Sequence, residues 1–131
     1  MSQNRVLTVY DCVRGSATGE LAFPQIVARL AAIDVQRYHC DYARRETTYY
    51  FADGESIVAT MPHERHEIGQ EFSAATVESA VRQSQRGEHA YDDFVRKTTA
   101  AGCVGYMVYI AGRHVAYLGR RGETHVEKFP D

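Results

Sequence analysis

His125 and Glu127 are two residues near the end of the chain whose types and spacing could support acid–base chemistry. They stand two positions apart in a stretch expected to be a β-strand, so both side chains point to the same face. A carboxylate that close to an imidazole can orient it for proton transfer. We add Arg113, Tyr117 and Glu123 as neighbouring candidates for ligand binding. The sequence favours the plainer interpretation, an edge strand that faces water, where charged side chains are common.

A second candidate for chemistry is the segment 63–67, which contains His63 and His66. A metalloprotease helix needs two histidines at positions i and i+4, whereas these are at i and i+3 and follow Pro62. A loop can still bind a metal through two histidines and a distant carboxylate. We expect a solvated linker here, and neither a metal nor another cofactor.

The three cysteines, Cys12, Cys40 and Cys103, are odd in number and show no metal-binding spacing. This pattern is typical of reduced thiols in a cytoplasmic protein, so we expect all three to be free. The sequence shows neither an apolar run of about 20 residues nor a basic, then apolar, N-terminus. We therefore expect no membrane association.

Arginines are frequent at the expected hairpin ends, and arginines among tyrosines on a sheet can hold single-stranded nucleic acid. However, residues 3–62 carry 6 basic against 7 acidic side chains, and residues 71–130 carry 8 against 7. Neither segment has the strong positive excess that binding to the phosphate backbone requires. We do not expect nucleic acid to be a partner.

The elements that must position these residues are repeated along the chain. Residues 3–62 align without a gap on residues 71–130, at an offset of 68 positions, with 18 identities in 60 pairs. Self-similarity of this extent indicates the duplication of one unit of about sixty residues. Residues 63–70 then form the join, and residues 1–131 are expected to form a single domain.

The repeat distinguishes shared positions from local ones. Tyrosine is retained at two equivalent pairs of positions, Tyr38 with Tyr106 and Tyr49 with Tyr117, which favours packing over a ligand cleft. By contrast, the positions of the C-terminal histidine and glutamate are occupied by isoleucine and alanine in the first unit, residues 57 and 59. A polar pair that replaces an apolar pair in one unit indicates a local role.

Each unit predicts two helices. The first helix is expected to bury Val6, Tyr10 and Val13, and the second, which begins near Pro24, has an apolar stripe that includes Leu30. In the second unit, the stripe of the first helix is carried by valines 77 and 81. Ser73 is the expected N-cap of the third helix. Gly102 is expected to end the fourth helix in the left-handed conformation, and Asp34 occupies its position in the first unit.

The rest of each unit predicts an antiparallel meander of three strands, over residues 36–42, 47–52 and 57–62, then 103–110, 114–119 and 123–129. Asp53-Gly54 predicts a two-residue type I′ hairpin turn, with further turns at residues 111–112 and 121–122. Two α-α-β-β-β units predict an α+β fold with pseudo-two-fold symmetry. The meanders pack against the helices and either join into one sheet or face one another.

Several of these segments resemble one known family. The resemblance is carried by Phe23 to Val27, Asp53 to Ile57, Gly105-Tyr106 and the closing stretch Gly122 to Glu127 with Phe129-Pro130. It covers nearly the whole chain and is similar to bacterial and prophage proteins of roughly this length, of unknown function, some labelled "phage envelope protein". The chain departs from the family at Asp34, where glycine is expected. The resemblance implies no substrate, cofactor or catalytic residue.

The sequence therefore favours a small non-catalytic binding or regulatory module over an enzyme. We expect a cytoplasmic protein that forms a homodimer or binds an unidentified small molecule or protein. The alternative is a small hydrolase-like enzyme that uses His125 and Glu127, with or without a metal. Convergence of these two residues with Arg113 in a concave pocket would support the enzyme hypothesis. A flat exposed edge lined by the two residues would exclude it.

Overall fold

The computed structural model describes residues 1–62 and 64–130 of the chain. In this part of the chain, four helices and six strands follow one another as helix, helix, strand, strand, strand, twice over. The first half holds α1 (Gln3–Thr18), α2 (Phe23–Ala32), β1 (Val35–Asp41), β2 (Glu46–Phe51) and β3 (Ser56–Thr60). The second half holds α3 (Ala74–Gln85), α4 (Tyr91–Ala100), β4 (Cys103–Tyr109), β5 (His114–Gly119) and β6 (Thr124–Lys128). The fold is α+β, and the predicted order of elements is confirmed.

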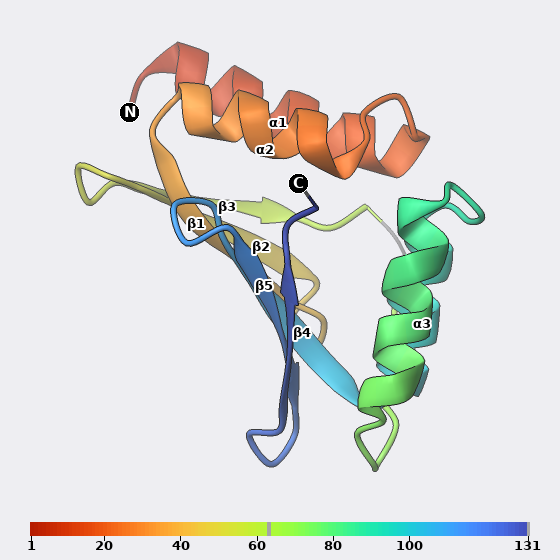
Figure 1. Cartoon of the computed structure of the whole chain (residues 1–131). Helices are drawn as coiled ribbons and strands as arrows, with labels where there is room; N and C mark the ends of the chain where they lie inside the picture. The colour runs from red at the N-terminus through yellow and green to blue at the C-terminus, as the bar shows by residue number, and fades with distance from the viewer. Residues whose placement is uncertain (63, 131) are drawn as a thin grey trace.

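All six strands form one antiparallel sheet in the order β3-β2-β1-β4-β5-β6. The two meanders, whose relation the sequence left open, are therefore joined side by side through β1 and β4 (Figure 1). At the middle of this seam, His39 lies opposite Met107. The first strand of each half thus occupies the centre of the sheet, and the third strands, β3 and β6, form its edges.

The helices lie on one side of the sheet (Figure 1). The first pair covers the first meander, with α1 against β3 and α2 against β1, and the second pair covers the other, with α3 against β6 and α4 against β4. Apolar and aromatic side chains fill the layer between them, including Val9, Leu30, Tyr38, Cys40, Tyr49, Val77, Phe94, Tyr106, Val108 and Tyr117. Within residues 1–62 and 64–130, no helix packs on the other side of the sheet, which we name the open face.

The predicted caps follow the sequence. The Ser73 hydroxyl accepts a hydrogen bond from the Thr76 N–H at 3.2 Å, as an N-cap does. Gly102 has a φ of 87° and Asp34 a φ of 70°, so both halves pass through the left-handed region after the second helix. Aspartate is among the few residues that tolerate this conformation.

The hairpin at Asp53-Gly54 is present, but the predicted turn type is wrong. A type I′ turn needs a positive φ at both residues, and only Gly54 has one, at 91°. The Phe51 N–H donates to the Glu55 carbonyl at 2.9 Å, and the Gly54 N–H donates to the Phe51 carbonyl at 3.0 Å. These bonds close a three-residue loop that ends in a left-handed glycine, and Gly122 repeats the arrangement with a φ of 86°.

The hairpins between the first two strands of each half contain an arginine in the left-handed region, Arg45 with a φ of 55° and Arg113 with a φ of 56°. The carbonyl of each arginine accepts an N–H from the end of its meander, from Met61 at 2.8 Å and from Phe129 at 2.9 Å. The turn predicted at residues 111–112 therefore extends to Arg113. Each arginine backbone ties its hairpin to the edge strand.

The prediction that Tyr10 packs in the core is wrong, because its side chain is 45% exposed. The buried stripe of α1 is instead formed by Val9, Cys12 and Gly15. A Cβ atom at Gly15 would overlap the Leu21 side chain. This close approach to Leu21 lies on the buried stripe, and Tyr10 lies outside that stripe.

The end of the join, which follows the segment 63–67 predicted to be a solvated linker, is docked on the second half. The Gly69 N–H donates to the Thr99 carbonyl at 2.8 Å. The Arg120 guanidinium donates to the carbonyls of Gly69 at 3.1 Å and of Ile68 at 2.7 Å, and the Ile68 side chain packs against the core. His63 lies outside the described residues.

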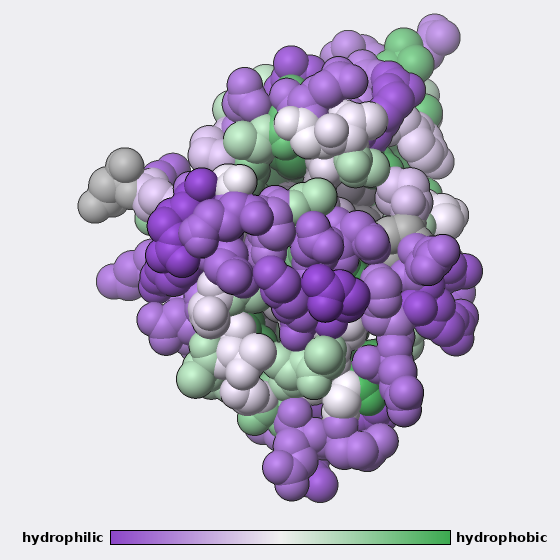
Figure 2. Space-filling view, turned by 90° about the vertical axis from the view of Figure 1, so that its right-hand side faces the viewer, coloured by the Kyte–Doolittle hydropathy of each residue, from purple (hydrophilic) through white to green (hydrophobic). Residues whose placement is uncertain are grey.

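The surface around α3 carries mostly hydrophilic side chains (Figure 2). None of the helices in the described part of the chain combines the length and the apolar character that crossing a membrane requires.

Candidate functional site

The open face presents three rows of side chains, and each row crosses all six strands from β3 to β6. The rows follow from the strand register, because residues paired across neighbouring strands point to the same face. The cationic row is Ser56, Tyr50, Arg37, Tyr109, His114 and Lys128. The central row is Val58, Thr48, His39, Met107, Ala116 and Val126, and the acidic row is Thr60, Glu46, Asp41, Gly105, Leu118 and Thr124.

Side chains of the cationic row stack on one another. The Arg37 guanidinium carbon lies 3.9 Å from the centre of the Tyr50 ring, a distance typical of a cation–π contact. The rings of Tyr109 and His114 stack with their centres 4.8 Å apart and their planes 28° apart. The row is therefore a continuous band of aromatic and cationic groups across β2, β1, β4 and β5.

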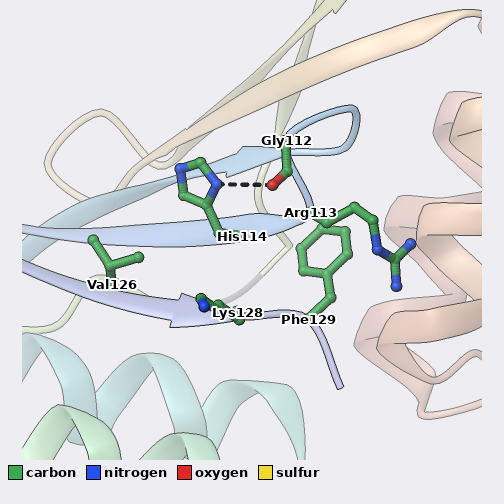
Figure 3. Close-up of a pocket in the computed structure, with 6 residues that line it drawn as sticks. All are labelled: Gly112, Arg113, His114, Val126, Lys128 and Phe129. Carbon is green, nitrogen blue, oxygen red and sulfur yellow. Dashed lines mark hydrogen bonds between the residues drawn. The ribbon is translucent and has the colours of Figure 1, made fainter. Parts of the chain in front are cut away.

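This band ends in a hollow of about 350 Å³, which lies where β5 begins and β6 ends (Figure 3). The hollow is lined by Gly112, Arg113, His114, Val126, Lys128 and Phe129. The Arg113 guanidinium carbon lies 5.5 Å from the centre of the Phe129 ring, and the two side chains lie together at one end of the hollow (Figure 3). His114 and Val126 lie at the other end, with Lys128 between the two groups.

The chemistry of the hollow is that of an anion site with an apolar wall. Arg113 and Lys128 carry positive charge, and none of the six lining residues has a carboxyl group. The His114 Nδ1 atom lies 3.1 Å from the Gly112 carbonyl oxygen, and because a carbonyl only accepts, Nδ1 donates. This bond and the stacking on Tyr109 fix the ring and leave its Nε2 atom available to a ligand.

His125 and Glu127 form a pair on the helix side of the sheet, not in the hollow. The His125 Nε2 atom lies 2.6 Å from the Glu127 Oε2 atom, and Arg82 of α3 donates to Glu127 Oε1 at 2.9 Å. The histidine and glutamate side chains are 18% and 11% exposed, so they are not on a flat exposed edge. The pair therefore meets Arg82 and not Arg113, which is the residue that the enzyme hypothesis requires.

The other two sequence candidates have structural positions. Tyr117 is buried among aromatic rings, with its centre 5.6 Å from that of Tyr106 and 6.4 Å from that of His125, and burial raises its pKa. Glu123 lies in the β5–β6 turn, where its carboxylate accepts the Arg121 N–H at 2.8 Å. Hydrogen bonds from its own N–H and from that of Arg121 lower the pKa of Glu123.

The structure thus does not bring the five sequence candidates together. Arg113 lines the hollow, whereas Tyr117, His125 and Glu127 lie on the helix side. Sequence reasoning missed His114 and Lys128, which lie directly opposite each other on β5 and β6. The signal that could have found them is the hairpin register.

A third group of polar side chains joins α3 to α4. The His89 Nε2 atom lies 2.7 Å from the Ser84 hydroxyl, and its Nδ1 atom lies 3.0 Å from the Lys97 ammonium. Burial and the lysine charge lower the pKa of His89. Because the ammonium donates to Nδ1, the proton of the neutral ring is on Nε2 and faces the hydroxyl. This tautomer cannot take a proton from Ser84, so the group is not a nucleophile–base pair.

The remaining candidates for metal or thiol chemistry are His66 and the three cysteines. Across residues 1–62 and 64–130, no group of three or more His, Cys, Asp or Glu side chains is arranged to hold a metal ion. His66 lies 3.2 Å from the Asp92 carboxylate. The three cysteines are free and buried, which confirms the predicted thiol state, and burial raises the pKa of Cys40 to about 12.

A family model described as a protein of unknown function, DUF1398, matches residues 13–127. The match agrees with the resemblance drawn from the sequence in its extent and in assigning no function. Among the curated proteins, none matches the chain.

Proposed function

We infer the function of this chain, which belongs to DUF1398, a family of proteins of unknown function, from its own surface. We propose that it is a non-catalytic binding module for a small anion that carries a flat apolar group. The proposed binding site is the hollow where β5 begins and β6 ends. The observation that carries the proposal is the set of groups that line it, two cations, an imidazole and an aromatic ring, with no carboxylate among them.

The lining divides the ligand into two parts. Arg113 and Lys128 suit a carboxylate, sulfonate or phosphate, because hydrogen bonds between charged groups are about twice as strong as neutral ones. The Phe129 ring and the Val126 side chain, which is 53% exposed, suit a flat apolar group. His114 adds one hydrogen-bonding nitrogen beside Val126, at the end of the hollow away from Arg113 and Phe129. Small-molecule sites in proteins are typically concave and combine apolar walls with a few polar groups, as this hollow does.

The corresponding turn of the first half lacks this chemistry. The positions of His114 and Lys128 are held there by Glu46 and Thr60, and Arg44 donates to Glu46 at 3.0 Å. An internal ion pair therefore takes the place of the hollow's two cations, which have no carboxylate among the lining residues. This difference supports a role specific to the second half, and it supplies a control for mutagenesis.

We also propose that the chain is a single domain that arose by duplication of an α-α-β-β-β unit, with pseudo-two-fold symmetry. The register of the seam supports this proposal. Tyr38 lies opposite Val108, and Cys40 lies opposite Tyr106. The offset of 68 positions takes Tyr38 to Tyr106 and Cys40 to Val108. Each pair is therefore mapped onto the other, as a two-fold axis through the seam would do. The left-handed arginines at equivalent turns give further support.

The binding proposal is tested by titrating the protein with anilinonaphthalene sulfonate, a fluorescent anion with flat rings. We expect saturable binding, and we expect Lys128→Gln to weaken it about tenfold, the loss of ~1.4 kcal/mol from one charged contact. The matched control is Arg44→Gln, which removes one positive charge from the corresponding turn of the first half. Its affinity should stay within about twofold of that of the parent.

Competition identifies the part of the probe that is recognised. Benzoate, which has both a flat ring and a carboxylate, should displace the dye more effectively than inorganic phosphate. Equal affinities of the parent and the Lys128→Gln variant would rule out the hollow as the binding site.

A further inference from the structure

We propose that two copies of this chain form a dimer by stacking their open faces, with the cationic row of each copy over the acidic row of the other. The two-fold axis of this dimer runs parallel to the rows, at the level of the central row. The proposal does not rest on ligand binding in the hollow. It rests on how charge and apolar side chains are distributed among the three rows.

Opposite charges are segregated on this face. Arg37 and Lys128 belong to the cationic row, whereas Glu46 and Asp41 belong to the acidic row, four residues away along the strands with the central row between them. Rows of one sheet face that are two residues apart are separated by about 7 Å. A face with opposite charges on its two sides is complementary to a second copy turned by 180° about the line between them.

The central row supplies the apolar contact along that line. Val58 and Val126, at its two ends, are 52% and 53% exposed on the edge strands β3 and β6. They occupy equivalent positions in the two halves and are among the most exposed large apolar side chains of the described residues. In the proposed dimer, each valine lies over the same valine of the partner.

The rows also match in shape near the centre of the sheet. The rotation places Arg37 over the partner's Asp41, an ion pair that occurs twice by symmetry. It places Tyr109 over the partner's Gly105, which has no side chain. Asp41 is held in place by the Ala43 and Arg44 N–H groups, which donate to its Oδ1 atom at 3.0 and 3.2 Å.

The size of the face is sufficient. Six strands about 4.8 Å apart and about 20 Å long cover roughly 600 Å² per copy, or roughly 1,200 Å² in total, the lower end of stable interfaces. Stacked sheets cross at about 30°, so contact is closest at the centre and the corners diverge. The hollow lies at a corner and shares His114, Val126 and Lys128 with the stacked rows.

Sedimentation velocity of the full chain tests the proposal. We expect a dimer at roughly 100 µM chain, and we expect Arg37→Glu, which sets two carboxylates against each other, to raise the dissociation constant at least tenfold. Arg86→Glu is the matched control, the same charge reversal at the end of α3, and it should leave the dimer unchanged. Circular dichroism and thermal melting establish that each variant is folded.

The orientation is tested by cross-linking. In the proposed dimer, a cysteine at position 126 of each copy lies about 12 Å from its counterpart, from a sheet separation of about 10 Å and the crossing angle. A bismaleimide of that span should therefore link Val126→Cys into a covalent dimer. A two-fold axis along the strands would instead place residue 126 over residue 58 of the partner, so Val126→Cys alone would stay unlinked. That axis would not pair Asp41 with Arg37, so Asp41→Asn would leave the affinity of the dimer unchanged.

A parent chain that stays monomeric at this concentration overturns the proposal, as does an Arg37→Glu variant that dimerises like the parent. A monomer that still binds the dye through Lys128 would overturn the dimer and leave the proposed function standing.

Discussion

At the residue scale, Tyr106 shows why the tyrosines retained in both halves are core residues. Its ring is buried between the sheet and α4, and its hydroxyl lies 2.6 Å from that of Tyr91. We expect Tyr106→Ala to lower the free energy of unfolding by about 3–5 kcal/mol, because it leaves a cavity. Tyr106→Phe removes only the hydroxyl and should cost about 1 kcal/mol. Urea unfolding measures both.

Tyr10→Ala is the control for this prediction, since it truncates an exposed tyrosine of α1 and should change stability by less than about 0.5 kcal/mol. A Tyr106→Ala variant as stable as the parent would contradict the packing interpretation and favour a ligand cleft.

The same scale shows the limit of reading a site from the sequence. Comparing the halves draws attention to His125 and Glu127, because the corresponding positions of the first half are apolar. His114 and Lys128 escape that comparison, because their counterparts are already polar. Their significance lies in pairing across β5 and β6 and in the absence of a nearby carboxylate among the lining residues, which only the assembled sheet reveals.

At the element scale, two glycines with similar backbone conformations make a matched test of what a turn requires. Gly54 has a φ of 91° and nothing within 4 Å of the place where a Cβ would lie. Gly102 has a φ of 87°, but a Cβ there would overlap the Glu71 carbonyl. We expect Gly54→Ala to cost about 1 kcal/mol from backbone strain alone. Gly102→Ala should cost at least twice that, because the backbone at Glu71, ahead of α3, must also move.

Thermal melting of the two glycine variants separates strain from crowding. Equal losses of stability would show that the close approach of Gly102 to the Glu71 backbone contributes nothing to stability.

The elements themselves were largely predictable, and the errors have local causes. Strong hairpin and cap signals placed every strand to within about two residues, because glycine and serine act through their own backbone geometry. The buried side of α1 was predicted wrongly at Tyr10, since a glycine contact with Leu21 overrides the apolar pattern. The pairing of β1 with β4 joins segments 68 positions apart, and no local signal specifies it.

At the scale of the whole molecule, the buried hydroxyls and thiols make stability depend on alkaline pH. Burial raises the pKa of Tyr38, Tyr42, Tyr91 and Tyr106 well above the usual value, and that of Cys40 to about 12. Their contribution is complete below the pKa values of the unfolded chain, about 8.5 for cysteine and 10 for tyrosine, and is lost as the pH rises through the raised values. We expect the melting temperature to fall steeply above about pH 9.

Ultraviolet absorbance of the phenolate during a pH titration checks this prediction. The four buried tyrosines should ionise together with unfolding. Ionisation of all the tyrosines near pH 10 in a folded chain would contradict it.

The seam between β1 and β4 has a consequence for how the molecule assembles. Because His39 and Met107 hold equivalent positions and face each other at its middle, a single ancestral unit could have paired with a copy of itself along the same strand. Such an encounter depends on how many chains are present. Tethering the two units replaces that dependence with a fixed effective concentration, often in the millimolar range for short linkers. On the proposed duplication, the covalent join thus frees the central sheet from dilution, whereas association through the open face still responds to abundance.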